Sequence, residues 1–200
     1  KDTMWPAGGG AKDAQVLKFT RAGRFIMQIG HQGKSQGSND TVNLGGAGDP
    51  LRVEGQWVTP EVLNLLGVAP LLGRTFNSQD GGPEGPGTAV IGYGLFQGRF
   101  GGDETVLGRQ VLLDGTPHTI VGVMPQGFRF PNRDTQLWVS RRFKSEDFDE
   151  RDNNYVYGIA RLKEGVSIET ARSEMGVVAA QLERAFPNEN ARVGATVDRL

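Results

Sequence analysis

The chain has 200 residues, of which 37% are hydrophobic and 22% are charged, and its formal net charge at pH 7 is -1. This length and composition can bury a sizeable core, as one large domain or two small lobes. The near-zero charge gives no electrostatic reason to expect nucleic acid or an anionic membrane surface as a partner. The absence of cysteine excludes a disulfide framework, a thiolate metal site and a cysteine nucleophile.

Glycine and proline are abundant, with 30 and 10 residues, which favours many turns and short elements over a helical bundle. The longest apolar runs, such as residues 111–113, span only a few residues, whereas a membrane-spanning helix needs about 20. The start of the chain has no basic region followed by an apolar one, so we expect no secretion signal within it. The expectation is a loop-rich domain that contains β-strands.

The first fifty residues carry the weakest local patterns. Residues 8–10 and 31–40 are expected to form loops, and residues 16–20 and 25–29 are expected to form short strands. Apolar and polar residues then alternate from Leu51 to Val58, which predicts a clearer strand.

A short helix is expected directly after this strand. Thr59 can accept a hydrogen bond from the first turn, Pro60 suits the first helical position, and Gly67 can end the helix in a left-handed conformation. Further along, residues 88–91 are typical of a strand, and residues 94–100 of a short helix that its glycines weaken.

Residues 110–123 are predicted to form a β-hairpin, because Asp114 and Gly115 suit the positive φ angles of a two-residue type I′ turn. In this register Pro117 faces Leu112 at a non-hydrogen-bonded position, where its missing amide does not weaken the hairpin. Both faces are apolar, so we expect the hairpin to lie between two layers. The two predicted faces carry Val111, Leu113 and Ile120 on one side and Leu112, Val121 and Val123 on the other.

The last long element is predicted to be an amphipathic helix over residues 167–186, with Ser167 as its N-cap and Pro187 blocking its continuation. Its polar face mixes both charge signs, which favours packing on a sheet over binding to a membrane surface. Strand-like residues 155–162 and 193–197 flank the helix, so a β-α-β arrangement is expected at the C-terminal end. The predicted apolar face comprises Ile168, Ala171, Met175, Val178, Leu182 and Phe186.

Two glycine patterns have a superficial similarity to nucleotide-binding motifs. Residues 30–35, Gly-His-Gln-Gly-Lys-Ser, end like a P-loop, but position 28 is Gln28 where the P-loop has glycine, and a helix is not expected to follow. The glycines at 92, 94 and 98 do not have the spacing of a dinucleotide-binding fingerprint. We interpret both patterns as loops or turns.

Metal and acid–base sites have equally little support. The two histidines, His31 and His118, have no partner at a spacing that brings metal ligands onto one face. The acidic stretch 145–152 lacks the glycine and the alternating ligands of a calcium loop. Asp103 and Glu104 are adjacent, so in a strand they would point to opposite faces. The sequence therefore predicts no catalytic, cofactor-binding or metal-ligating residues, and no cofactor.

Residues 67–131 carry a series of glycine-marked motifs in a fixed order. The motifs are Gly67-Val68-Ala69-Pro70-Leu71-Leu72-Gly73-Arg74-Thr75-Phe76, Phe100-Gly101-Gly102-Asp103, Leu107-Gly108-Arg109, Asp114-Gly115 and Val121-Gly122-Val123-Met124-Pro125-Gln126-Gly127-Phe128-Arg129-Phe130-Pro131. This series resembles the MacB-like periplasmic core domain, a module of the permease subunits of macrolide-exporter-type ABC transporters and their FtsX-like relatives.

The resemblance extends loosely over residues 51–200, and its spacing is most similar to that of the longer, acidobacterial-type permeases. Matches continue at residues 136–139, Gln-Leu-Trp-Val, at 160–167, Ala-Arg-Leu-Lys-Glu-Gly-Val-Ser, and at 181–187, Gln-Leu-Glu-Arg-Ala-Phe-Pro. Within the matched motifs, Arg74 and Arg109 are expected to pair with carboxylates or loop carbonyls. Turns or close backbone approaches are expected at Gly73, Gly108, Gly122 and Gly127, and core packing at Phe76, Phe128, Phe130 and Trp138.

The resemblance implies an α+β fold in a single core domain over residues 1–200, a mixed two-lobed domain with short strands, a central β-hairpin and a C-terminal β-α-β segment. Lobe one would comprise about residues 1–70 with 156–200, and lobe two about residues 71–155. The domain would lie on the periplasmic side of the cytoplasmic membrane, inserted between the first and second transmembrane helices of a permease.

The resemblance also implies a non-enzymatic function. ATP would be hydrolysed by a separate ATP-binding subunit or domain, and a second permease copy would complete a dimer. The hypothesis is that the domain relays ATP-driven motion of the membrane helices to substrates or to a periplasmic partner protein, in export or in mechanotransmission. The alternative is a secreted or surface binding module for a peptide, glycan or lipid. An enzyme ranks third, because it would need polar residues brought together from distant parts of the sequence.

Overall fold

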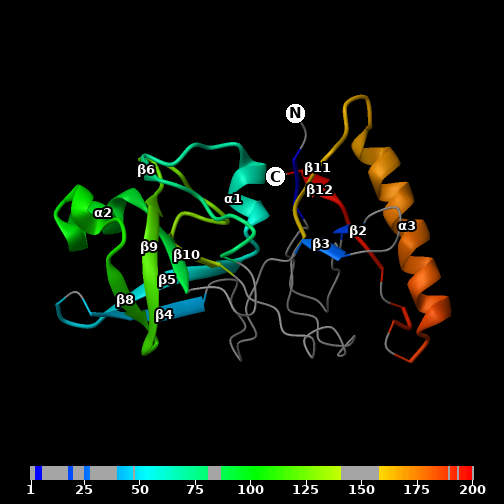
Figure 1. Cartoon of the computed structure of the whole chain (residues 1–200). Helices are drawn as coiled ribbons and strands as arrows, with labels where there is room; N and C mark the ends of the chain where they lie inside the picture. The colour runs from blue at the N-terminus through cyan, green and yellow to red at the C-terminus, as the bar shows by residue number, and fades with distance from the viewer. Residues whose placement is uncertain are drawn as a thin grey trace. The chain divides into compact units, whose positions relative to one another are not determined.

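The structure is a computed structural model of the 200-residue chain. It describes residues 3–5, 18–19, 25–27, 40–46, 48–80, 87–140, 158–188, 190–192 and 194–199. These residues form a mixed α/β protein in which strands outnumber helices (Figure 1). The chain divides into two compact units: unit 1 is Lys1–Ile29 with Lys144–Leu200, and unit 2 is Gly30–Phe143.

Unit 2 is built on a seven-stranded sheet, six strands of which close on themselves. The strand order is β6-β9-β7-β10-β5-β4-β8, and an additional pairing between β8 and β9 completes the ring, with β6 appended at an edge of β9. In chain order the strands are β4 (Asp40–Gly45), β5 (Leu51–Val58), β6 (Leu72–Gly73), β7 (Thr88–Ile91), β8 (Gln110–Leu113), β9 (Thr116–Val123) and β10 (Thr135–Ser140).

One apolar cluster draws buried side chains from all six strands of the ring, which places it inside the closed sheet. Helix α2 (Tyr93–Phe100) and the 3-10 turn η1 (Glu104–Val106) add further apolar side chains to it. Its buried members are Val42, Leu44, Val53, Ala89, Ile91, Leu95, Phe96, Phe100, Val106, Val111, Leu113, Ile120, Val123, Leu137 and Val139. On β4, β7, β8 and β10 the members of this cluster are two residues apart, as the alternation of a strand requires.

The predicted hairpin is confirmed, but one of its predicted faces is wrong. Asp114 and Gly115 have φ angles of 47° and 81°, and Leu112 pairs with Pro117 as expected. Between β7 and β9, however, the register shifts, so that Ala89 pairs with Ile120 and the next residue pairs with Gly122. This bulge brings Val123 into the inner cluster beside Ile120, because one inserted residue reverses the alternation of a strand.

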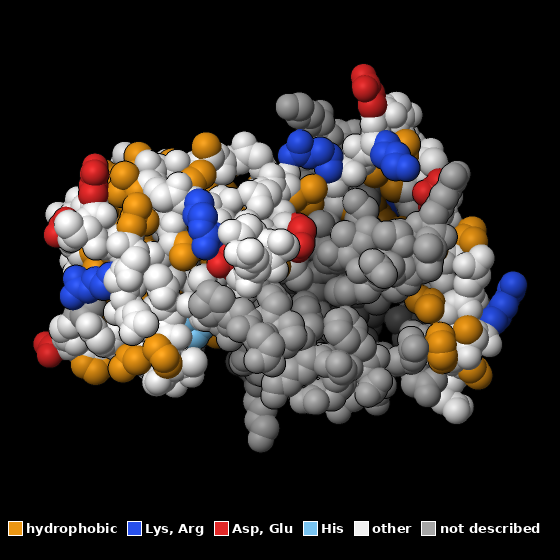
Figure 2. All heavy atoms as spheres, in the orientation of Figure 1, with side chains coloured by type: hydrophobic (Ala, Val, Ile, Leu, Met, Phe, Trp, Pro, Cys, Tyr) orange, Lys and Arg blue, Asp and Glu red, His pale blue; other side chains and the backbone are white. Residues whose placement is uncertain are grey.

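Leu112 gives a second correction, because its side chain is 41% exposed and no layer covers it. The hairpin therefore has one buried face and, along β8, one face in contact with solvent, not two buried faces. On the face drawn in Figure 2, basic and acidic side chains of the described residues are interspersed, in keeping with the near-zero net charge of the chain.

The outer face of the same sheet carries a second set of buried side chains. Gln56, Trp138 and Val90 form one row across three adjacent strands, and Val58, Ser140 and Thr88 form the next row. Helix α1 (Glu61–Leu66) and the residues that follow β6 and β9 also supply buried apolar side chains. These are Val62, Leu63, Phe76, Met124 and Phe130. The indole of Trp138 contacts the ring of Phe128 edge-on, with centroids 5.1 Å apart, and donates a hydrogen bond to the Phe130 carbonyl at 2.9 Å.

Four further element predictions for unit 2 are confirmed, and the predicted cap of α1 is wrong. The strands β5 and β7 have the predicted bounds, α2 begins one residue before its predicted start, and Gly67 ends α1 with a φ of 72°. Thr59 is not a side-chain cap, because its buried hydroxyl has no partner and only its carbonyl accepts the amide of Val62. The strand β4 was not predicted, although Val42 and Leu44 alternate with polar residues.

The described part of unit 1 contains a three-stranded sheet and the long helix α3 (Ile168–Ala185). Strand β1 (Thr3–Trp5) lies in the middle and runs antiparallel to both β11 (Ala160–Arg161) and β12 (Asp198–Arg199). The strands β11 and β12 are therefore parallel, and α3 connects them in a β-α-β arrangement. A separate pair is formed by β2 (Lys18–Phe19) and β3 (Phe25–Met27).

Helix α3 begins as predicted, because the Ser167 hydroxyl accepts a hydrogen bond from the Thr170 amide at 3.1 Å. Of its predicted apolar face, Ile168 and Ala171 are buried with Val197, and Met175 packs partly against them. The strand predicted at 193–197 is wrong: residues 194–197 are not in a strand, and the pairing begins at Asp198. Among the described helices, none is both long and apolar enough to cross a bilayer.

The boundary between the units also differs from the predicted lobes. Residues 30–70 were assigned to lobe one, but the structure groups Gly30–Phe143 in unit 2. The physical reason is strand pairing, because β5 lies between β4 and β10 in the closed sheet. The predicted loops at 8–10 and 31–39 lie outside the described residues, as do residues 155–157 of the strand predicted at 155–162, of whose described part only Ala160–Arg161 is a strand.

Candidate functional site

The most distinctive local structure in unit 2 is a segment, residues 71–80, that follows α1 and crosses the end of β9. The amide of Arg74 donates to the carbonyl of Val121 at 2.9 Å. A Cβ atom on Gly122 would lie 2.1 Å from the Arg74 carbonyl oxygen, and one on Gly73 would lie 2.3 Å from the Val121 carbonyl oxygen. The predicted close approach at Gly73 and Gly122 is thus confirmed, since only glycine lets these backbones come this near.

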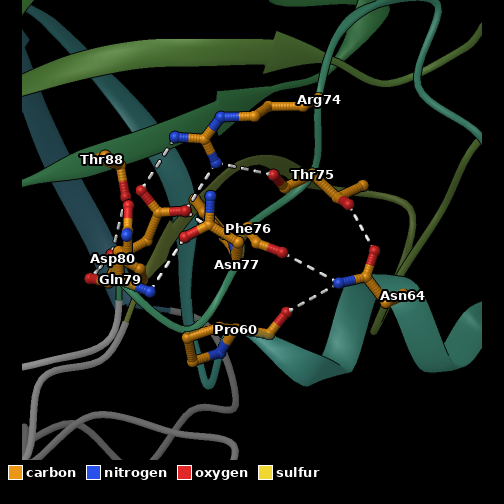
Figure 3. Close-up of polar contacts among 10 residues, drawn as sticks. Pro60, Asn64, Arg74, Thr75, Phe76, Asn77, Gln79, Asp80 and Thr88 are labelled. Atoms are coloured by element: carbon orange, nitrogen blue, oxygen red, sulfur yellow. Dashed lines mark hydrogen bonds and ion pairs between the residues drawn. The ribbon is translucent and has the colours of Figure 1, made fainter.

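Beyond this crossing, the side chain of Arg74 turns to Asp80 (Figure 3). The guanidinium donates two hydrogen bonds to the Asp80 carboxylate, at 2.6 and 3.1 Å. The amide of Asn77 donates a third, at 2.7 Å. Asp80 is only 1% exposed, whereas the Arg74 side chain is 47% exposed. The expectation that Arg74 pairs with a carboxylate is confirmed; Arg109 lies over the ring of Phe100, 5.7 Å from its centroid, and its positive charge also acts on the carboxylate of Asp103.

Burial alone would raise the pKa of Asp80, but the hydrogen bonds from Arg74 and Asn77 and the positive charge of Arg74 outweigh it. The pKa of the carboxyl group is therefore held below its usual range, and the side chain is ionised at neutral pH. Because three donors already occupy the carboxylate, it is suited to holding a loop in place and not to taking up a proton from a substrate.

The main chain of Asp80 is tied to the sheet. Its carbonyl accepts a hydrogen bond from the buried hydroxyl of Ser140 at 2.8 Å, and the Thr88 hydroxyl lies 2.8 Å from that of Ser140. The contact joins the ends of β7 and β10 to the 71–80 segment.

At its other side, the same segment is tied to α1. The amide group of Asn64 donates to the Phe76 carbonyl at 2.9 Å, and its oxygen accepts a hydrogen bond from the Thr75 hydroxyl. Figure 3 shows Asn64 reaching from the helix to this segment, opposite the side on which Asp80 and Thr88 lie. Side-chain and main-chain groups within six consecutive residues thus bridge the helix and the sheet.

The cluster around Asp80 lies near the end of β10, from which the chain continues to unit 1. The first strand of the unit starts at Asp40, which pairs with Gly55, and β10 ends at Ser140, which pairs with Val58. Both strands flank β5, one antiparallel and one parallel to it. Asp40 and Ser140, the described residues of the sheet nearest in sequence to unit 1, therefore both lie toward the C-terminal end of β5.

The residues that the sequence suggested as possible metal, nucleotide or acid–base sites do not lie in the cluster around Asp80. His118 lies in β9, with its Nδ1 2.9 Å from the Thr116 carbonyl, and Asp103 caps η1 by accepting the Thr105 amide at 2.9 Å. Gly92 precedes α2 as its N-cap. The P-loop-like residues 30–35, with His31, and the acidic stretch 145–152 lie outside the described residues. Within the described part of the chain, no three His, Cys, Asp or Glu side chains come together as metal ligands do.

Asp80 and Ser140 were missed by the sequence analysis. Asp80 falls in a polar, glycine-rich stretch that is typical of a surface loop, and Ser140 ends a strand whose other residues are mostly apolar. The only sequence signal near them was Arg74 in a matched motif, which predicts a carboxylate partner without saying which one.

Solved structures show where this fold occurs. A domain of a putative permease protein from Porphyromonas gingivalis has a TM-score of 0.59 and 15% identity, with 100% of this chain and 89% of that chain covered. The periplasmic region of MacB from Actinobacillus actinomycetemcomitans has a TM-score of 0.55 and 13% identity over 94% and 85% of the two chains. The extracellular domain of the noncanonic ABC-type transporter YknZ from Gram-positive bacteria has a TM-score of 0.55 and 14% identity over 87% and 79%.

At these identities the likeness shows a shared fold. No curated protein sequence is similar enough to this chain to match it. The model of one protein family, the MacB-like periplasmic core domain, matches residues 8–177, which is most of the chain. The chain belongs to the family of MacB-like periplasmic core domains, the extracytoplasmic domains of ABC transporter permeases.

Proposed function

We propose that this domain relays ATP-driven movement of the membrane helices of its permease to substrates or partner proteins on the outer side of the cytoplasmic membrane. The domain itself is non-catalytic in this proposal. A separate ATP-binding subunit or domain hydrolyses ATP, and a second copy of the permease completes the working dimer.

The observation that carries the proposal is the path of the chain. In unit 1, Met4 near the start of the chain pairs with Arg199 near its end. A domain inserted between two membrane helices needs its two ends side by side, and this pairing meets that requirement. Unit 2 in turn is an insertion within unit 1, and the described sheet residues nearest in sequence to unit 1, Asp40 and Ser140, lie toward the same end of β5. The proposal is that movement entering at the paired ends reaches unit 2 through the chain at these two points.

The test measures the separation of the units in the complete permease, reconstituted with its ATP-binding subunit in lipid nanodiscs. Because these 200 residues contain no cysteine, spin labels can be placed at cysteines introduced at the exposed positions Gln181 in α3 and Thr116 in β9, once any cysteines in the rest of the permease and in its ATP-binding subunit have been replaced. We expect the distribution of distances between the two labels to change between the nucleotide-free and the ATP-bound transporter.

A control pair at Thr116 and Glu104, both exposed within unit 2, should give the same distances in the two states. An unchanged distance between Gln181 and Thr116, with ATP bound and hydrolysed normally, would contradict the relay and leave the family assignment intact.

The rival hypothesis is a secreted or surface binding module for a peptide, glycan or lipid. Membership of a family of permease domains favours the relay over this rival. The cluster around Asp80 also favours it, because its polar groups bind one another and so join elements of the domain, where a ligand site would leave them open.

A further inference from the structure

We propose that Ser140, Thr88 and Asp80 form a latch that couples the end of β10 to helix α1, so that the two respond together when the chain is displaced. The functional meaning of the latch rests on the proposed relay, but its existence can be tested without it.

The first step of the argument is the position of Ser140. It is 5% exposed and ends the strand from which the chain continues to unit 1. Its hydroxyl contacts both the hydroxyl of Thr88 on β7 and the main-chain carbonyl of Asp80. A displacement of the end of β10 must either carry Asp80 with it or break a buried hydrogen bond, which is unfavourable because water cannot replace the lost partner.

The second step is the stiffness of residues 74–80. The Asp80 amide donates to the Asn77 carbonyl at 3.0 Å, and the Asn77 side chain accepts the Gln79 amide at 2.9 Å. Together with the bonds from Arg74 and Asn77 to the Asp80 carboxylate, these contacts fold the segment onto itself. A segment with this many internal bonds moves as a body and does not deform residue by residue.

The third step leads to the surface. Asn64 ties this body to α1, and the residues directly after α1 expose apolar side chains, with Val68 at 37% and Leu71 at 48% exposure. A continuous series of contacts therefore leads from Ser140 to a surface that contains two exposed apolar side chains. A contact path is not yet coupling, so the coupling itself has to be measured.

The experiment is amide hydrogen exchange on the 200-residue chain, comparing Ser140→Ala with Thr135→Val. Thr135 is a matched control because it is a buried hydroxyl residue on the same strand whose side chain contacts Asn132 and not the latch. We expect Ser140→Ala to speed exchange at least tenfold at the Asp80 amide and also at the Gly67 amide, which closes α1 on the Asn64 carbonyl. The Asp114 amide, bonded to the Asn43 carbonyl far along the sheet, should keep its rate.

The reciprocal variant Asn64→Ala keeps the proposal testable if Ser140→Ala does not fold, because Asn64 is on the surface. Coupling between two sites acts equally in both directions, so this variant should speed exchange at the Asp80 amide without changing that of Asp114. Three results would overturn the latch: faster exchange at Asp80 with none at Gly67, an equal increase at Asp114, or no effect of Asn64→Ala on Asp80. None of them bears on the distance measurement in the whole permease, so the latch and the relay fail separately.

Discussion

The two faces of the closed sheet in unit 2 are held together in different ways. On the inner face, the buried cluster of side chains is apolar, and it is supplied by all six strands of the ring. On the outer face, the buried residues include Gln56, Thr88 and Ser140 on the strands, and Asp80, whose carbonyl accepts a hydrogen bond from Ser140. The inner face needs only side chains of suitable size, whereas the outer face needs particular donors and acceptors at particular positions.

This difference separates stability from function within one sheet. Apolar packing is tolerant of exchange among residues of similar volume, and it fixes no loop in a single position. Buried hydrogen bonds are directional, and each is costly to leave unmade. The proposed coupling therefore runs on the side of the sheet on which the 71–80 segment lies.

The largest expected effect is on the inner face. Leu137→Ala removes a fully buried side chain of β10 from the centre of the cluster and should lower the free energy of unfolding by about 3–4 kcal/mol. Its neighbour on the outer face, Trp138→Phe, keeps most of the volume but loses the bond to the Phe130 carbonyl, and should cost about 1–2 kcal/mol. Urea unfolding of the two variants measures both values. A larger loss of unfolding free energy for Trp138→Phe than for Leu137→Ala would contradict this difference between the two faces.

The crossing of the 71–80 segment over β9 gives the next effect. Gly122→Ala would place a Cβ atom 2.1 Å from a main-chain oxygen, and backbone cannot move aside as a flexible side chain can. We expect a loss of about 3 kcal/mol, with faster exchange of the Arg74 amide. The control is Gly94→Ala in α2, where a Cβ atom has nothing within 4 Å and should stabilise the helix by about 0.5–1 kcal/mol. Equal effects of the two substitutions would mean that the crossing is not tight.

The inner face was largely predictable from the sequence, and the outer face was not. Alternation predicted Leu51–Val58 with its correct bounds, and Asp114 with Gly115 predicted the hairpin, because both signals are local. The bulge that turns Val123 inward depends on pairing with β7 and has no local signal.

The contacts among Ser140, Thr88 and Asp80 could not be predicted from sequence patterns, for a similar reason. Ser140 lies 52 residues from Thr88 and 60 from Asp80 in the chain, so nothing in the spacing joins them. Asp80 also stands in a stretch whose composition indicates a solvated loop, and its burial follows only from how residues 71–80 cross the sheet. The matched motif that contains Arg74 predicted that this residue pairs with a carboxylate. Only the fold shows which carboxylate it is.

Two ion pairs test whether a pair with a buried carboxylate stabilises the fold more than a pair whose two side chains are both exposed. Arg74→Met leaves the buried carboxylate of Asp80 without its charged partner and should cost about 2 kcal/mol, less than a fully buried pair because the guanidinium is half exposed. The matched variant is Arg172→Met in unit 1, whose pair with Asp198 has side chains 50% and 35% exposed and should cost no more than about 1 kcal/mol. Thermal and urea unfolding of both variants test this order, and a larger loss for Arg172→Met would reverse it.

The smallest expected effect is on the pH dependence of stability. Because the pKa of Asp80 is lower in the folded chain than in the unfolded one, ionised Asp80 stabilises the fold at any pH above the unfolded value of about 3.9. This contribution is lost as the pH falls through the lower, folded pKa. The difference in unfolding free energy between the natural chain and Asp80→Asn should therefore stay constant from pH 7 to about pH 5 and shrink below about pH 4. A difference that persists unchanged to low pH would mean that shape and neutral hydrogen bonds, and not the charge of the carboxylate, hold the 71–80 segment to the outer face.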